Sequence, residues 1–169
     1  MSTTEGIPSQ ATHEHASQSL SVGVGLSGVT DGSANGSSVA GAVRDVVSVR
    51  LPAAAAYLAV LRTTTASLAA RLDFTLDEIE DLRIAVDEAC CLLLADAAPG
   101  AELTSVFEMA DGEIHVTVST QTSHPRGPAR ESFAWTVLSA LAGHVDSWTG
   151  PDGQQTIALV KHRMHEVSA

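Results

Sequence analysis

The pattern of hydrophobic and polar positions divides the chain into a tail and one ordered domain. Residues 1–45 are dominated by serine, threonine, glycine and alanine, contain no aromatic residue and show no sustained period of 2 or 3.6. Such a segment buries too little apolar surface to offset the entropy of ordering it, so we predict that it is disordered. Residues 46–165 carry regular patterns and form the predicted domain.

Two helices are predicted in the first half of this domain. A β-branched, alternating strand over residues 46–51 leads through Pro52, which suits a helix start, into an alanine- and leucine-rich helix over residues 53–72. The second helix begins at a capping box formed by Thr75 and Glu78. Its predicted apolar face consists of six residues: Leu76, Ile79, Leu82, Ala85, Ala89 and Leu93.

The second half of the domain predicts two β-hairpins around a third helix. An Asp-Gly turn joins the first pair of strands and Gly-Pro-Asp-Gly joins the second. A loop rich in proline and glycine over residues 121–131 precedes a helix over residues 132–145. The predicted strands cover residues 102–109, 113–120, 145–148 and 154–162. This order predicts an α+β fold, a two-layer sandwich with the helices on one face of a mostly antiparallel sheet.

The composition excludes several classes of protein. The chain of 169 residues has 9 lysines and arginines against 20 aspartates and glutamates, a formal net charge of −11. This balance argues against a nucleic-acid-binding protein, because little positive charge is available to neutralise phosphates. No hydrophobic run approaches the roughly eighteen residues of a membrane span, and the N-terminus lacks the basic region of a secretory signal. We therefore expect a cytoplasmic protein that contacts neither nucleic acid nor membrane.

Three stretches carry a resemblance to a known family. LDFTLDEIEDLRIAVDEA (72–89), SFAWTVLSALAGHVDSW (132–148) and TIALVKH (156–162) resemble elements of the GHKL (histidine-kinase-like ATPase) fold. More narrowly, they are similar to the RsbW/SpoIIAB-type anti-sigma factors, and most of all to the actinobacterial sigma-F antagonist (UsfX-like) branch. The resemblance runs from about Val49 to His162. It implies a two-layer sandwich of the GHKL type.

The resemblance also implies positions for catalytic groups on the second helix. Active kinases of the family hold a glutamate there that activates the attacking hydroxyl, and an asparagine one turn later that ligates Mg²⁺. Glu88 stands at the glutamate position and Leu92 at the asparagine position. Leucine offers no oxygen to a metal. Asp96 lies on the same face and could supply an oxygen, but it is two turns from Glu88. Glu88 itself is either a catalytic base or an ordinary exposed carboxylate.

The nucleotide-binding motifs of the family are degenerate in this chain. The resemblance places the adenine positions at Thr120 and Thr122, the phosphate positions at Arg130, Ser132 and Ala134, and the final glycine at Gly153. Neither threonine is an anion or a glycine, and a Cβ in the phosphate cradle hinders close approach of the backbone. Arg130 is either a retained phosphate contact or an ordinary loop arginine. We expect no bound cofactor and no metal site, with ATP and Mg²⁺ binding at most weakly.

Arg62 is the candidate partner-binding residue. It is the only charged residue between Ala53 and Ala70 in the first predicted helix. The resemblance aligns it with the family arginine that contacts the sigma factor, and a guanidinium suits a carboxylate on a partner surface. The alternative is a solvated helix arginine.

Two functions follow from the resemblance. The first is an anti-sigma factor that sequesters an alternative, stress-type sigma factor similar to sigma-F and is released by anti-anti-sigma partners of the STAS type. The second is an active serine kinase that phosphorylates such a STAS partner with ATP. The degenerate motifs favour the first, because phosphoryl transfer depends on a positioned metal and phosphate cradle. A homodimer that pairs through the sheet near the first strand is also implied.

The cysteines and tryptophans have ordinary structural interpretations. Cys90 and Cys91 are interpreted as buried or half-buried thiols of a helix, because no basic neighbour in the sequence favours a reactive thiolate. Trp135 and Trp148 are expected in the core.

Overall fold

From residue 45 onward, the strands and helices follow one another in the predicted order. The computed structural model describes residues 21–23, 44–124 and 127–164. The elements have the following bounds: β1 Ser21–Gly23, β2 Asp45–Pro52, η1 Ala55–Tyr57, α1 Leu58–Arg71, α2 Leu76–Ala95, β3 Glu102–Ala110, β4 Glu113–Gln121, α3 Phe133–Ala142, β5 His144–Thr149 and β6 Gln154–His162.

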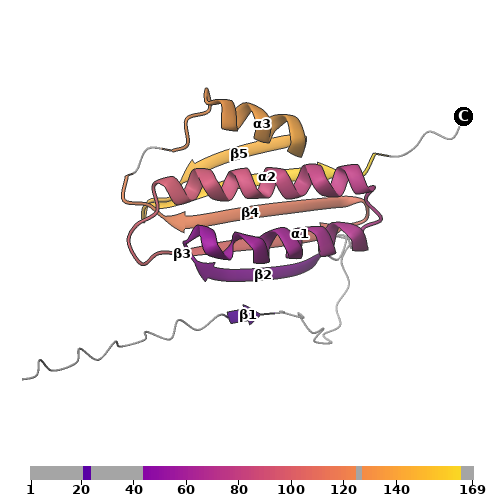
Figure 1. Ribbon diagram of the computed structural model, residues 1–169, viewed down its shortest axis with the longest axis horizontal. Helices are drawn as coiled ribbons and strands as arrows, with labels where there is room; N and C mark the ends of the chain where they lie inside the picture. Colours follow the sequence, from indigo (N-terminus) through magenta and orange to yellow (C-terminus); the bar gives the residue numbers. More distant parts are fainter. Residues whose placement is uncertain (1–20, 24–43, 125–126, 165–169) are drawn as a thin grey trace, which may run out of the picture.

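The described strands form one sheet that makes up the back layer of the domain (Figure 1). They lie in the order β1-β2-β3-β4-β6-β5, and every pair of neighbours is antiparallel. The helices α1, α2 and α3 cover the same face of this sheet. This arrangement confirms the predicted two-layer α+β sandwich.

Alternate side chains of the central strands face the helices and form the core. Phe107 in β3 pairs with Val116 in β4, which pairs with Leu159 in β6, and all three residues are fully buried. Their neighbours along each strand lie on the uncovered face, because successive side chains of a strand point to opposite faces. A chain with only 4% aromatic residues therefore fills its core mostly with leucine, valine and isoleucine.

The helix α2 begins at the predicted capping box. The Thr75 hydroxyl accepts a hydrogen bond from the Glu78 N–H, and the Glu78 carboxylate accepts one from the Thr75 N–H. Leu76, predicted on the buried face, is instead 72% exposed. Phe74, just ahead of the cap, is buried, as is typical of the hydrophobic residue that precedes an N-cap. The buried hydrophobic face of α2 consists of Leu82, Ala85, Val86, Ala89, Cys90 and Leu93.

Two helices are shorter than the sequence predicts. The turn η1 precedes α1, which begins at Leu58 instead of residue 53. The third helix ends at Ala142, because Gly143 has a φ of 81°, which does not continue a right-handed helix. Residues 144 and 145, predicted at the end of that helix, instead begin β5, which contains the strand predicted over residues 145–148.

Both predicted hairpins form, and the second one leaves Trp148 in solvent. Gly112, with φ 67°, turns the chain between β3 and β4, and Gly153, with φ 81°, turns it between β5 and β6. Trp148 lies three residues from Val145, which packs against the core, so it points to the uncovered face of an edge strand. Trp148 is 49% exposed, so its prediction as a core residue is wrong, whereas Trp135 is 9% exposed and lies in the core.

The segment predicted as a disordered tail contains one short strand. Ser21–Gly23 form β1 and pair with residues 48–50 of β2, so the prediction of disorder does not hold for these three residues. The prediction also fails at the end of the tail, because Asp45 is the first residue of β2 and Arg44 forms ion pairs with Glu108 and Glu113. The remaining residues of that prediction, 1–20 and 24–43, lie outside the described residues. Among the described helices, none combines the length and the apolar character needed to cross a membrane.

Candidate functional site

The catalytic position on α2 lies next to a hydrophobic one. Glu88 is half-buried and forms no hydrogen bond or ion pair with any described residue. Leu92, one turn later, is partly buried and packs against the core. The position that the resemblance assigns to the metal ligand is therefore apolar, and Glu88 has no polar partner among the described residues.

The two threonines at the adenine positions use their hydroxyl groups locally. Thr120 is buried, and its Oγ1 donates to the Glu102 carbonyl at 2.9 Å. The Thr122 Oγ1 donates to the carbonyl of Asp96 at 2.9 Å, and the Thr122 N–H donates to the Gly153 carbonyl at 3.2 Å. The structure thus brings the end of α2, the end of β4 and the turn before β6 together through hydrogen bonds of Thr122.

Gln155 adds a buried amide to this region. It pairs with Thr120 across β4 and β6 and is 1% exposed. Its Oε1 has no hydrogen-bond partner among the described residues. Only the strand register shows that this glutamine lies beside Thr120.

The residues at the phosphate positions cap α3 and bind the edge strand. The Ser132 hydroxyl accepts from the Trp135 N–H at 3.2 Å, which makes Ser132 the N-cap of α3, and Ala134 lies half-buried in the first turn. Arg130 donates to Asp146 Oδ1 at 2.6 Å and to a backbone carbonyl of β5 at 2.7 Å. Its guanidinium also lies 5.3 Å from the centroid of the Trp135 ring. These contacts hold Arg130 against β5.

Arg62 is paired within the chain. Its Nη1 donates to Asp87 Oδ1 at 2.8 Å, which joins α1 to α2. The two side chains are 41% and 30% exposed, so the ion pair lies at the surface. Arg62 is therefore neither a freely solvated arginine nor one held inside the core. The sequence did not reveal this partner, because Asp87 lies 25 residues away on another helix.

The exposed residues of α1 ahead of its last residue are uncharged. They are Ala59, Val60, Thr63, Ser67 and Ala70, and the exposed Arg71 follows at the end of the helix. The hydroxyls of Thr63 and its neighbour Thr64 donate to carbonyls of the preceding turn, each at 2.9 Å, so these side chains satisfy their donors within the helix. An open hollow of about 590 Å³ borders this face. In a chain of net charge −11, such a neutral helix surface is a candidate contact area.

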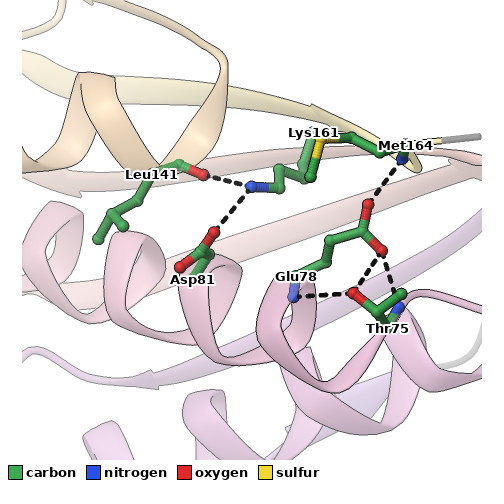
Figure 2. A network of polar contacts seen from close by, with 6 residues as sticks. All are labelled: Thr75, Glu78, Asp81, Leu141, Lys161 and Met164. Atoms are coloured by element: carbon green, nitrogen blue, oxygen red, sulfur yellow. Dashed lines mark hydrogen bonds and ion pairs between the residues drawn. The ribbon is translucent and has the colours of Figure 1, made fainter. Parts of the chain in front are cut away.

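A polar network fastens the end of the described chain to α2 (Figure 2). The carboxylate of Glu78, which is 1% exposed, accepts from the Thr75 N–H and hydroxyl and from the Met164 N–H at 2.6 Å. Burial alone would raise the pKa of Glu78, but these hydrogen bonds lower it below the ordinary value. Lys161 donates to the Leu141 carbonyl at 2.7 Å and pairs with Asp81 at 3.3 Å, which joins β6, α3 and α2.

A second polar cluster lies at one end of the uncovered sheet face. Glu113 contacts His115 Nε2, lies 3.2 Å from His162 Nδ1 and 3.5 Å from Arg44. The hydrogen bond from His115 is the main cause that lowers the pKa of Glu113. Within residues 44–124 and 127–164, no three histidine, cysteine or acidic side chains are arranged to hold a metal ion.

The two cysteines differ in exposure. Cys90 is buried, and burial raises the pKa of its thiol to about 12. Cys91 is exposed, which departs from the prediction of a buried or half-buried thiol, and its pKa is also raised, by partial burial and by Asp87 and Glu88. Raised pKa values keep both thiols protonated and disfavour reactive chemistry.

Comparison with known proteins identifies the family. No family model matches the chain. The anti-sigma-F factor RsbW of Mycobacterium tuberculosis (strain ATCC 25618 / H37Rv) is 38% identical over 117 residues, which cover 68% of this chain and 68% of the relative. The chain belongs to the RsbW family. The serine-protein kinase RsbW of Bacillus cereus (strain ATCC 10987 / NRS 248) is 35% identical over 75 residues, 43% of this chain and 47% of that relative.

A solved structure agrees with the fold expected of an RsbW protein. The structure of the RsbU and RsbW domains of a Mycobacterium tuberculosis protein matches with a TM-score of 0.55 and 18% identity. The match covers 69% of this chain and 32% of that chain. The two-layer sandwich is thus of the GHKL type, as the sequence predicts.

Proposed function

We propose that this RsbW protein is an anti-sigma factor that binds and sequesters an alternative sigma factor of the sigma-F type. The observation that carries the proposal is the 38% identity, over 68% of both chains, to a protein named anti-sigma-F factor. The neutral outer face of α1, with Arg62 at its border, offers a surface for such a partner. A cytoplasmic location belongs to the same proposal, because a sigma factor acts on RNA polymerase there.

The proposal is tested by direct binding to purified sigma factor. The expected result is a stoichiometric complex with the sigma-F-type sigma factor of the same organism, measured by isothermal titration. Transcription in vitro from a promoter that depends on that sigma factor should fall as this protein is added. Absence of binding at tens of micromolar would contradict the proposal, because sequestration requires roughly micromolar affinity or tighter.

Release by a STAS-type partner is the second part of the proposal. A competitor that binds an overlapping surface frees the sigma factor by simple exchange, at a ratio set by the two affinities. In a competition titration, an anti-anti-sigma protein should displace labelled sigma factor from the complex. Simultaneous binding of both partners would contradict an overlapping surface.

We also propose that the protein forms a homodimer through the uncovered face of the sheet near β2. The centre of that face carries small uncharged side chains, among them Val106, Thr117 and Ala158, which lie side by side across β3, β4 and β6. Light scattering is expected to give twice the monomer mass. A Thr117→Glu variant should be monomeric but fold normally, because it places charge on the face of the sheet that the helices leave uncovered. A monomeric wild type would refute the dimer.

Nucleotide binding is proposed to be absent or weak. Leu92 stands at the position of the metal ligand and packs against the core. The Thr120 hydroxyl donates to the Glu102 carbonyl, and the Ser132 hydroxyl accepts a hydrogen bond as the N-cap of α3. None of these three side chains supplies the metal ligand, the anion or the glycine that the resemblance implies at its position. Titration with ATP and Mg²⁺ should show no submicromolar binding.

An active serine kinase is the second candidate function. It is favoured by the half-buried carboxylate of Glu88, which has no polar partner among the described residues, and by a relative named serine-protein kinase that matches 43% of this chain. Incubation with a STAS partner and labelled ATP separates the candidates. Transfer of label that disappears in Glu88→Gln would establish the kinase, and no transfer alongside tight sigma binding supports the binding protein.

A further inference from the structure

We propose that Asp87 is a positioning residue, which holds the guanidinium of Arg62 so that its free edge can receive a carboxylate of the sigma factor. The inference rests on the proposed function. It concerns an ion pair between α1 and α2 that lies at the border of the neutral face of α1.

The geometry leaves one edge of Arg62 available. Among the described residues, Arg62 has a single partner, Asp87, and uses Nη1 for it. A guanidinium carries five N–H groups and can bind carboxylates bidentately along either of two edges. With Nη1 occupied, the edge formed by Nε and Nη2 is the one left for a second carboxylate. Arg62 is 41% exposed, so a partner can reach it.

Anchoring matters because arginine is flexible. A free arginine side chain samples many rotamers, and a partner that immobilises it loses binding free energy in doing so. Asp87 already holds Arg62 at 2.8 Å in the unbound protein. Arg62 therefore loses its rotamer freedom when the protein folds and not when the partner binds. The free edge of its guanidinium is already ordered in the unbound protein.

The surroundings indicate what kind of segment fits. No other charged residue occurs between Ala53 and Ala70, and the hydroxyls of Thr63 and Thr64 are bonded within the helix. A matching segment would therefore be apolar along α1 and would carry one carboxylate at the position of Arg62. Asp87 and Glu88 repel further acidic groups on the α2 side, which restricts the partner to a single carboxylate there.

The alternative role for Asp87 is that its carboxylate competes with the carboxylate of the sigma factor for the Arg62 guanidinium. The two roles make opposite predictions for Asp87→Ala. A positioning residue, when removed, weakens sigma binding, whereas a competitor, when removed, strengthens it. The free Nε–Nη2 edge favours positioning, because a partner can bind Arg62 without breaking the existing hydrogen bond.

The first experiment uses the free protein. The Nε–Hε resonance of Arg62, followed by ¹⁵N NMR, should show restricted motion in the wild type and fast averaging in Asp87→Ala. The matched control is Glu80→Ala, which removes another acid of α2 that forms an ion pair, with Arg83. It should leave the Arg62 resonance unchanged. Equal motion of the Arg62 side chain in the wild type and in Asp87→Ala would overturn the proposal, independently of any result on sigma-factor binding.

The second experiment measures binding to the sigma-F-type sigma factor of the same organism. Asp87→Ala should raise the dissociation constant about fivefold, Asp87→Glu should restore part of the loss, and Glu80→Ala should have no effect. In an Arg62→Ala background, Asp87→Ala should cause no further change. Tighter binding by Asp87→Ala, or an equal effect in both backgrounds, would overturn the inference. If the wild type does not bind the sigma factor at all, the proposed function fails first and this inference fails with it.

Discussion

The carboxylate of Glu78, in the first turn of α2, accepts a hydrogen bond from the backbone N–H of Met164, which lies 86 residues later in the chain. The same carboxylate completes the capping box with Thr75. One buried acidic group therefore begins a helix and fastens the chain after the last strand. Removing it affects two distant parts of the fold at once.

Replacing Glu78 by alanine should destabilise the protein by about 2–4 kcal/mol, because it removes a helix cap and leaves buried donors without an acceptor. Urea unfolding followed by circular dichroism measures the change. Asp77→Ala, an exposed acid in the same turn, is the control and should cost less than about 1 kcal/mol. Equal losses in the two variants would show that the contacts of Glu78 contribute nothing beyond the charge of the first turn.

Stability should fall as the pH is lowered below the ordinary range of a carboxyl pKa. The pKa values of Glu78 and Glu113 are both lowered in the folded protein. A lowered folded-state pKa contributes stability that is present above the unfolded value and is lost as the pH falls through the folded value. Melting temperatures measured from pH 7 to pH 3 should therefore decrease below about pH 4.5. The double variant Glu78→Gln with Glu113→Gln should show a shallower decrease, and an unchanged slope would contradict the assignment.

Arg62→Ala should weaken sigma binding about 30-fold, the equivalent of roughly 2 kcal/mol, and leave the fold nearly as stable as before. The ion pair with Asp87 is exposed, so its loss should cost less than about 1 kcal/mol. Arg62→Lys should rescue binding only in part, because an ammonium cannot form the bidentate contact. Arg71→Ala, an exposed arginine at the end of the same helix, is the control. Early melting of Arg62→Ala would mean that the residue is structural.

Leu92→Asn should fail to restore ATP binding and should also destabilise the protein. The leucine packs against the core, so a polar side chain there loses about 1–3 kcal/mol of burial. The other positions remain engaged, Thr120 with the Glu102 carbonyl and Ser132 with the α3 cap. Calorimetry with ATP and Mg²⁺, together with urea unfolding, tests both parts. Micromolar ATP binding by this variant would show that the missing metal ligand alone accounts for the weak ATP binding of the wild type.

Local patterns in the sequence predicted most of the fold. The capping box of Thr75 and Glu78 lies within one turn, and the Asp-Gly turn at Gly112 lies within one hairpin, so neighbouring residues determine both. The end of α3 was misplaced because the apolar pattern continues past Gly143, where the backbone conformation and not hydrophobicity stops the helix. Trp148 was misplaced because hydrophobicity does not reveal which face of an edge strand a residue occupies.

The contacts of the candidate site were the hardest to predict. The partner of Arg62 is 25 residues away and the second partner of Glu78 is 86 residues away. Such pairs depend on how the helices pack on the sheet, which no short-range pattern encodes. The resemblance aligned Arg130 with a phosphate contact, but it could not show that the side chain binds β5.

The position of Arg130 has a consequence for how the protein behaves at high concentration. β5 is an edge strand of the described sheet, and open strand edges invite pairing with the same edge of another molecule. Arg130 occupies the Ser147 carbonyl and the Asp146 carboxylate with its charged group, and the Trp135 ring lies beneath it. An incoming strand would have to displace a cation to reach this backbone. Arg130 therefore obstructs the pairing of another strand with β5 at this point of the sheet edge.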